Sequence, residues 1–383
     1  MKIDSTHLNR REMLRQTALL SSLAFAPFPA RALGEEKEDG TLIPFLDVQP
    51  PGKGLRWENL ESWITENKDV FAVQHYGTPE VDAGKWHLEI SGLVKNARTL
   101  SLGQLKQRPR KSVIATLECS GNSSNPGFMG AVANVKWTGT PLAALLRECS
   151  PLKRGIETVF FGADEKVEKI REKDYSQNFA RSLGMADAMR DDILLAYEMN
   201  GEPLPKEHGG PVRLVVPGWF GIAWIKWLSR IEVLDRRYMS KYMGREYVTI
   251  RGEEKEGKTI WRETSVGPID IKSMIARAVR LKNGAVRLTG AAWNDGTPFD
   301  RVELKIDNEP WTAVTLDRKN RAAFGWTFWS HVWKKPQPGD HTLVSRALDI
   351  QGRIQPGAED PEIKLKRTYW EANQQHPRKI RIA

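Results

Sequence analysis

Short apolar runs separated by turns occupy the first half of the chain, from about residue 45 to residue 235. They predict β-strands at the following segments: 86–90, 113–117, 158–161, 193–197 and 212–216. Thr140 and Pro141 precede apolar residues at helical spacing, which predicts a helix with Thr140 as its N-cap and Pro141 at its first position. We therefore expect a mixed α/β domain over residues 45–235, whose loops can converge on one cavity.

The hydrophobic pattern changes after a charged stretch at residues 236–267, which we interpret as a linker or a long surface connection. Beyond it, apolar and polar residues tend to alternate, and turn residues separate the alternating segments, as in 286–291, 302–306 and 342–347. This pattern predicts a β-sandwich of the immunoglobulin kind over residues 265–383. The expected fold class is thus α+β, with a mixed α/β domain followed by an immunoglobulin-like sandwich.

The amino terminus has the features of an export signal. Arg10 and Arg11 precede an apolar stretch at residues 17–28, and Ala30-Arg31-Ala32 has the small residues of a cleavage site. We expect residues 1–32 to be a twin-arginine signal peptide, with a basic amphipathic anchor as the alternative. That route carries folded proteins, so it favours a cofactor inserted before export and a periplasmic mature chain. No later apolar run approaches the roughly 18 residues that a membrane span requires.

Composition excludes several classes of protein. The chain has 383 residues, of which 40% are hydrophobic and 28% charged, as in soluble globular proteins of about two domains. Two cysteines cannot build a disulfide framework or an iron–sulfur site, and no C-x-x-C-H motif for attached haem occurs. The net charge of +10 is spread over short clusters. This spread disfavours nucleic-acid binding and suits docking of an acidic protein partner.

Cys119 is the first candidate for chemistry. It lies in the segment Glu118-Cys119-Ser120-Gly121-Asn122, which follows the apolar strand at 113–117 directly, and Gly121 and Asn122 give its loop the freedom for close backbone approach to a ligand. A thiolate binds soft metals or acts as a nucleophile, whereas a lone cysteine is more often a small buried hydrophobe. Cys149, which lies on the helical pattern, has the second interpretation.

Three cationic or titratable residues near loop edges form a second candidate group. His208 stands in a glycine loop, Arg213 lies on a predicted strand, and Lys226 follows a Pro-Gly turn. Imidazole, guanidinium and ammonium groups can hold a phosphate or the polar edge of a ring. Considered one at a time, each has the alternative of an ordinary surface hydrogen bond.

Taken together, these segments resemble the sulfite oxidase family of molybdopterin enzymes, from about Phe71 to the carboxyl terminus. The resemblance rests on these motifs: Cys119-Ser120-Gly121-Asn122, Tyr197-Glu198-Met199-Asn200-Gly201, Pro203-Leu204-Pro205, His208-Gly209, Pro211-Val212-Arg213, Val216-Pro217-Gly218 and Lys226-Trp227-Leu228. It implies that Cys119 supplies the one protein thiolate to molybdenum. It also implies a homodimer formed through the sandwich, and a pterin with its phosphate held by the following residues: His75, Asp164, His208, Arg213, Trp224, Ile225 and Lys226.

The chain departs from the family's pattern where a small anion would bind. Gln74 stands next to His75 where the family carries a nearby arginine, and Ser124 lies where an arginine is expected just past the cysteine. The family tyrosine that approaches the molybdenum is replaced by Phe179, with Tyr175 nearby. The loss of charged hydrogen bonds should weaken the capture of a dianion.

Arg181, or an arginine of the second domain such as Arg321, is a candidate to replace the missing cations. The expected catalytic set is therefore Cys119, Gln74, Phe179 and Arg181.

Three functions remain open at this stage. The first is oxidation of sulfite or a related sulfur oxyanion, with electrons passed to a separate c-type cytochrome. The second keeps the molybdenum fold but acts on a neutral or organic substrate, for example by sulfoxide reduction, which fits the loss of cationic groups. The third is a non-catalytic binding protein that uses the sandwich and a degenerate pocket.

Overall fold

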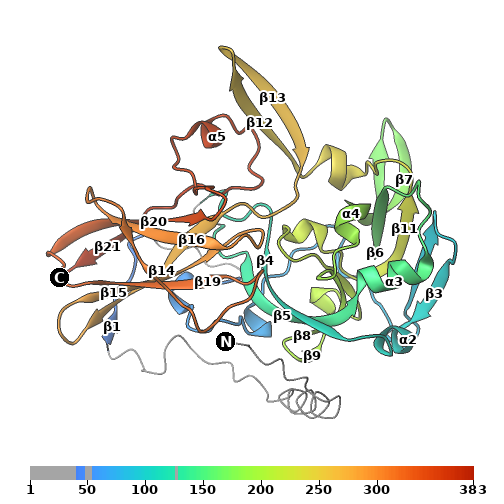
Figure 1. The fold of residues 1–383 in the computed structure, drawn as a ribbon, viewed down its shortest axis with the longest axis horizontal. Coiled ribbons are helices and arrows are strands. Elements are labelled where there is room, and N and C mark those ends of the chain that lie inside the picture. The colour runs from blue at the N-terminus through green and yellow to red at the C-terminus, as the bar shows by residue number, and fades with distance from the viewer. Residues whose placement is uncertain (1–39, 48–53, 126–127) are drawn as a thin grey trace, which may run out of the picture.

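The computed structural model describes residues 40–47, 54–125 and 128–383 (Figure 1). The predicted signal peptide of residues 1–32 lies outside these residues. Strands dominate, so the first half is richer in strands than the expected mixture of helix and strand. The helices are short: η1 (Trp57–Asn59), η2 (Asn67–Asp69), α2 (Leu102–Lys106), α3 (Leu142–Cys149), α4 (Met185–Ala188), η3 (Lys206–His208), η4 (Gly221–Ala223), η5 (Lys241–Arg245) and α5 (Pro361–Lys364).

Two five-stranded sheets build the first half of the chain. One has the order β10 (Arg213–Val215), β8 (Leu194–Met199), β5 (Val132–Pro141) and β4 (Lys111–Glu118), with β9 (Glu202–Pro203) paired to β8. The other has the order β3 (Arg98–Ser101), β2 (His87–Gly92), β11 (Leu228–Leu234), β6 (Glu157–Ile170) and β7 (Lys173–Gly184). Strand β8 is buried along nearly its whole length, which is why its sequence is a continuous apolar run.

The second half contains two sheets that pack around their own apolar core (Figure 1). The first has the order β1 (Gly40–Leu42), β14 (Lys272–Leu281), β15 (Val286–Trp293), β19 (Thr327–Trp333) and β18 (Thr315–Leu316). The second has the order β17 (Thr312–Ala313), β16 (Phe299–Ile306), β20 (Gly339–Asp349) and β21 (Arg378–Ile382). The alternation of buried and exposed residues along β21 is typical of a strand with one face on a core.

The predicted helix after Thr140 exists, but it begins later than expected. Helix α3 starts at Leu142, Pro141 is its N-cap residue, and no side chain caps it. Thr140 belongs to β5, and its hydroxyl donates to the carbonyl of Leu105 over 3.0 Å. The N-cap prediction was therefore wrong, because a tertiary contact uses the hydroxyl that the local sequence offered to the helix.

The charged stretch at residues 236–267 is more than a linker. It contains η5 and the β-hairpin of β12 (Val248–Lys255) and β13 (Lys258–Ser265), which projects from the molecule between the two halves (Figure 1). Most of β13 is exposed, in agreement with its charge. Tyr242 and Tyr247, however, are buried at the root of the hairpin.

One apolar core joins the two halves, because buried residues from both belong to the same cluster. Trp63 and Trp326 show the connection most clearly. The indole of each donates to the backbone carbonyl of the other over 2.9 Å. This reciprocal pair links residues that are 263 positions apart.

Replacing Trp326 by Phe should therefore destabilise the chain by about 1–3 kcal/mol, because one buried hydrogen bond and part of a packed ring are lost. The free energy of unfolding in denaturant measures the effect. The matched control is Trp261→Phe, since Trp261 is 44% exposed and its change should stay within about 0.5 kcal/mol. Equal stability of the two variants would contradict the structural role of the reciprocal pair.

Candidate active site

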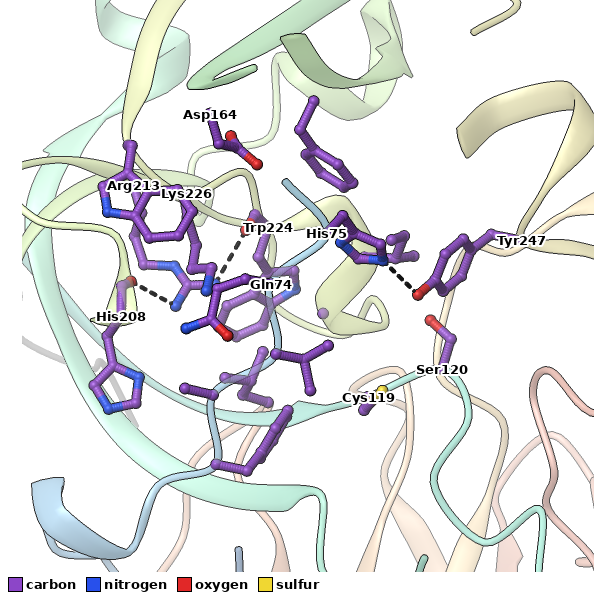
Figure 2. Close-up of a pocket in the computed structure, with 18 residues that line it drawn as sticks. Gln74, His75, Cys119, Ser120, Asp164, His208, Arg213, Trp224, Lys226 and Tyr247 are labelled. Atoms are coloured by element: carbon purple, nitrogen blue, oxygen red, sulfur yellow. Dashed lines mark hydrogen bonds between the residues drawn. The ribbon is translucent and has the colours of Figure 1, made fainter. Parts of the chain in front are cut away.

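A cavity of about 650 Å³, part of it open to solvent, lies beside the end of β4 (Figure 2). Its lining includes most of the site residues expected from the sequence: Gln74, His75, Cys119, Asp164, Phe179, His208, Arg213, Trp224 and Lys226. Ile225 is buried in the apolar core and is not among the lining residues. Cys149 is likewise buried, on α3.

Cys119 is held where β4 ends and its loop begins. Its backbone N–H donates to the carbonyl of Ala131 over 2.9 Å, and its carbonyl accepts from the N–H of Asn122 over 2.9 Å. The side-chain oxygen of Asn122 accepts in turn from the N–H of Ala131. Burial raises the pKa of the Cys119 thiol above its ordinary value. A bound cation would therefore be needed to hold it as a thiolate at neutral pH.

Arg213 is a buried cation in the cavity wall. Its two terminal nitrogens donate over 3.0 Å to the backbone carbonyls of His208 and Trp224 (Figure 2). Burial lowers the pKa of Arg213 to about 9. Its Nε is buried and has no partner among the described residues. This N–H is thus an unsatisfied donor on a residue of the cavity lining.

Further titratable groups surround Arg213, and burial shifts the pKa of each. Burial and the charge of Arg213 lower the pKa of Lys226 to about 7 and that of His208 to about 4. Burial raises the pKa of Asp164 to about 6, and Asp164 Oδ1 has no partner among the described residues. In the described part of the chain, no carboxylate lies within ion-pair distance of Arg213 or Lys226. The cluster has an excess of positive charge and is complementary to an anion.

A glycine allows this cluster to pack closely. Gly209 has a φ of +102°, and a Cβ there would lie 2.7 Å from the Cβ of Lys226. The His208-Gly209 motif is therefore explained by both the backbone conformation and the close approach of Lys226.

An aromatic group occupies the side of the cavity nearer to Cys119 (Figure 2). The hydroxyl of Tyr247 is 2.7 Å from Nε2 of His75, whose ring stacks on Phe179 at a centroid distance of 4.9 Å. Burial lowers the pKa of His75 to about 4, so the ring is neutral at pH 7. Burial also holds the pKa of Tyr247 above its usual range. The pair is thus a neutral hydrogen-bonded unit at physiological pH.

A second hollow meets the cavity at Cys119 and Tyr247, and we call it the mouth. Its described lining contains no charged side chain and consists of Val73, Cys119, Gly121, Ser124, Asn125, Phe128, Tyr247, Tyr369 and Trp370. Trp370 stacks on Tyr247 at a centroid distance of 4.0 Å and contacts Tyr369 at the same distance. Ser124 lies in this lining without the charge of the arginine that the family pattern led us to expect.

Neither candidate arginine takes the place of the missing cations. Arg181 is only 2% exposed, and its terminal nitrogens donate to the backbone carbonyls of Tyr242 and Val266. It is not among the lining residues of the cavity or of the mouth. Arg321 is exposed and is also outside both linings. Arg181 instead ties β7 to the root of the β12–β13 hairpin.

Sequence reasoning missed Tyr247, Tyr369 and Trp370. Tyr247 lies in the stretch interpreted as a linker, and the other two lie in a segment after α5 for which no role was expected. No local pattern marks them, because tertiary folding alone brings both segments to Cys119. The chain has Phe179 where the family pattern has a tyrosine, but a different tyrosine, Tyr247, lines the same cavity as Cys119.

Comparison with known proteins agrees with this geometry. Residues 75–242 match the family described as oxidoreductase molybdopterin binding domain. The chain is 28% identical over 350 residues to the mitochondrial sulfite oxidase of Homo sapiens, covering 84% of this chain and 62% of the relative. It is 30% identical over 321 residues to nitrate reductase [NADH] 2 of Phaseolus vulgaris, covering 74% of this chain and 36% of the relative. The chain thus spans less than two thirds of these relatives' length.

A solved structure has the same fold. It is the sulfane dehydrogenase SoxCD from Paracoccus pantotrophus, with a TM-score of 0.72 and 24% identity, covering 94% of this chain and 98% of that chain.

The donor set of the cavity fits the cofactor of that family. A soft sulfur ligand lies at one side, and the other side holds unpartnered buried polar atoms, Arg213 Nε and Asp164 Oδ1, within an excess of positive charge. These groups suit a metal joined to an organic ring system with an anionic phosphate. Residues 75–242 thus carry an oxidoreductase molybdopterin binding domain, and the motifs, the cavity and the similarity to mitochondrial sulfite oxidase support a molybdopterin oxidoreductase of the sulfite oxidase type.

Proposed function

We propose that this oxidoreductase acts on a small sulfur compound in the periplasm and exchanges electrons with a separate c-type cytochrome, which accepts them where the substrate is oxidised and donates them where it is reduced. The observation that carries the proposal is the position of Cys119 between the cationic cavity and the uncharged mouth. When bound, the molybdenum–pterin group supplies two-electron oxygen-atom transfer. The chain's own residues bind and orient that group and shape the space for the substrate.

The residues that would hold the cofactor follow from the unpartnered Arg213 Nε and Asp164 Oδ1 and from their neighbours in the cavity lining. Cys119 would be the protein ligand of molybdenum. Arg213 Nε and the ammonium of Lys226 would hold the phosphate, and His208 and Asp164 would contact polar groups of the pterin. Two carbonyls already fix the guanidinium of Arg213 beside the cavity.

Tyr247 and His75 would form hydrogen bonds with the substrate where the cavity meets the mouth. The Tyr247 hydroxyl remains protonated at neutral pH, and it is hydrogen bonded to an imidazole that is neutral there. In the tautomer in which Nε2–H of His75 donates to the Tyr247 oxygen, the hydroxyl proton can be donated to an oxygen of a substrate or product at the mouth, and Gln74 adds an amide to the cavity lining. Trp370 holds the phenol ring in place by stacking.

Two substrate classes remain candidates. Sulfite or a related oxyanion is supported by the names of the similar proteins, sulfite oxidase and sulfane dehydrogenase. A neutral or organic sulfur compound, such as a sulfoxide to be reduced, is supported by the described lining of the mouth, which has no cationic side chain. Because an anion there would lose hydration without a charged partner, the mouth favours the second class.

The partner, the location and the assembly are also parts of the proposal. The twin-arginine sequence supports export, and the scattered positive charge supports docking of an acidic cytochrome. A homodimer through the β-sandwich is proposed from the family resemblance. In the described part of the chain, no helix has the length and apolarity to cross a membrane.

Metal analysis followed by steady-state kinetics tests the function. We expect stoichiometric molybdenum in the wild type and its loss in Cys119→Ser, because an alcohol is a poor replacement for the soft thiolate. With sulfite and ferricyanide or cytochrome c, we expect a high KM, whereas sulfoxides should be reduced in a reduced-dye assay. Full turnover and metal content in Cys119→Ser would refute the ligand assignment. A low KM for sulfite would favour the oxyanion class.

The pH dependence of anion binding tests the cationic end of the cavity. In the chain purified without cofactor, sulfate should bind roughly 20-fold more weakly at pH 8.5 than at pH 6.5. Lys226, with a pKa of about 7, is protonated below that pH and loses its charge above it. Titration calorimetry at constant ionic strength measures the binding.

The Lys226→Met variant is the control for this titration. It should bind sulfate more weakly, with a change of less than about twofold over the same range, because His208 stays neutral there and Asp164 is mostly ionised. An unchanged pH dependence in the variant would show that another group controls binding.

Replacing Tyr247 by Phe should lower kcat about 10–100-fold, because it removes the hydroxyl but keeps the ring that stacks on Trp370. Steady-state kinetics of metal-loaded protein provides the measurement. Tyr369→Phe is the matched control, since Tyr369 lies in the same mouth and is 57% exposed; its kcat should change less than about twofold. Equal rates in both variants and the wild type would mean that the Tyr247 hydroxyl has no part in turnover.

A further inference from the structure

Glu118, the residue before Cys119, carries a buried carboxylate that lies outside the cavity lining. Its side chain is 0% exposed and accepts three hydrogen bonds. The Lys272 ammonium donates to Oε1 over 2.5 Å, the Asn122 amide donates to Oε1 over 2.9 Å, and the Trp293 indole donates to Oε2 over 2.8 Å. Both carboxylate oxygens are thus occupied, and only one orientation of the side chain satisfies all three donors.

The donors come from two distant parts of the chain. Asn122 belongs to the Cys119 loop, whereas Lys272 and Trp293 face each other across β14 and β15 in the second half. Lys272 is itself buried, with a side-chain exposure of 3%. The paired residues Lys272 and Trp293 of this sandwich sheet therefore hold Glu118, the residue next to Cys119, by hydrogen bonds.

The segment after α5 holds the same loop from another side. The backbone N–H of Glu371 donates to the carbonyl of Ser120 over 2.8 Å, and the amide of Gln374 donates to the carbonyl of Ser123 over 3.0 Å. The loop from Glu118 to Ser123 is thus bonded to the second half at three positions. These bonds fix the backbone on both sides of Cys119.

Stability alone does not account for a buried ion pair at this place. Desolvation of two charges offsets much of their attraction, and a packed apolar pair is often as stable. Buried polar networks instead specify one geometry when every member is satisfied. The groups next to a metal ligand also orient that ligand and tune the metal.

We propose that Glu118 and Lys272 are positioning residues for the metal centre. Their ion pair fixes the direction of the Cys119 side chain and sets the electrostatic field behind its sulfur, so that a residue of the second half controls the properties of the metal site. The inference rests on the proposed role of Cys119 as the molybdenum ligand. It concerns residues that touch neither the cavity nor the mouth.

The test compares the metal-loaded wild type with Lys272→Met and with the double variant Glu118→Gln/Lys272→Met. The double variant leaves no unpaired buried charge, so it remains informative where the single variant does not fold. Molybdenum content, the Mo(V) electron paramagnetic resonance spectrum, the reduction potential, kcat and KM are measured on each. We expect shifted g-values, a shifted potential and a loss of about tenfold in kcat or metal content, with KM within about twofold.

Arg378→Met is the matched control. Arg378 is also 3% exposed and pairs with Asp47 and Glu58, and among the described residues none of its hydrogen bonds or ion pairs reaches the Cys119 loop. Its loss should lower the melting temperature and leave the spectrum and the potential unchanged. If both Lys272 variants behave in the same way as Arg378→Met, the pair is only structural and the proposal is overturned. A wild type without molybdenum would instead refute the function proposed above, so the two failures are distinguishable.

Discussion

The excess of buried positive charge around Arg213 is the constraint on which the site depends. A guanidinium in an apolar interior is costly unless dipoles or an anion compensate it, and here two backbone carbonyls supply part of the compensation. Lys226 adds a second cation, and burial together with the charge of Arg213 lowers its pKa. The paired strands β8 and β10 and the Gly209 turn hold this arrangement before any ligand arrives. The cavity is therefore preorganised for an anionic group, and an anion bound there would restore the ordinary protonation of the cations.

The Cys119 loop connects this preorganised cavity with the second half of the molecule. It leaves β4 within the first half, yet Lys272, Glu371 and Gln374 bond it to the β-sandwich and to the segment after α5. The continuous apolar core holds the two halves in fixed relative positions, so that these contacts can form. The stacking of Trp57 on Trp293 is one of its contacts. A thiol on a loop held from two sides has little freedom, which is what a fixed metal ligand requires.

Local patterns predicted much of the fold and the polar end of the site, whereas long-range contacts decided the rest. The apolar runs at 86–90 and 193–197 correspond to β2 and β8, and the strand before Cys119 ends at Glu118, one residue beyond the predicted end at 117. Arg181 shows the limit of this reasoning. Its position in a suitable segment suggested a substrate ligand, but carbonyls 61 and 85 residues away take its guanidinium. Tyr247 shows the converse, because a residue from an apparent linker becomes part of the site only through the packing of the hairpin root.

The distribution of charge along the cavity bears on how the chain selects a substrate. Cations lie at the end suited to the pterin phosphate, and a bound phosphate would neutralise much of their field before it reached the mouth. The mouth itself is formed by aromatic rings, with Trp370 between Tyr247 and Tyr369. Such rings offer dispersion contacts to an organic group and little compensation for the hydration that a dianion would lose. Two regions of the chain that lie far apart in sequence thus form the two ends of the site: the first half supplies the cationic groups of the cavity, and the segment after α5 supplies Tyr369 and Trp370 to the mouth.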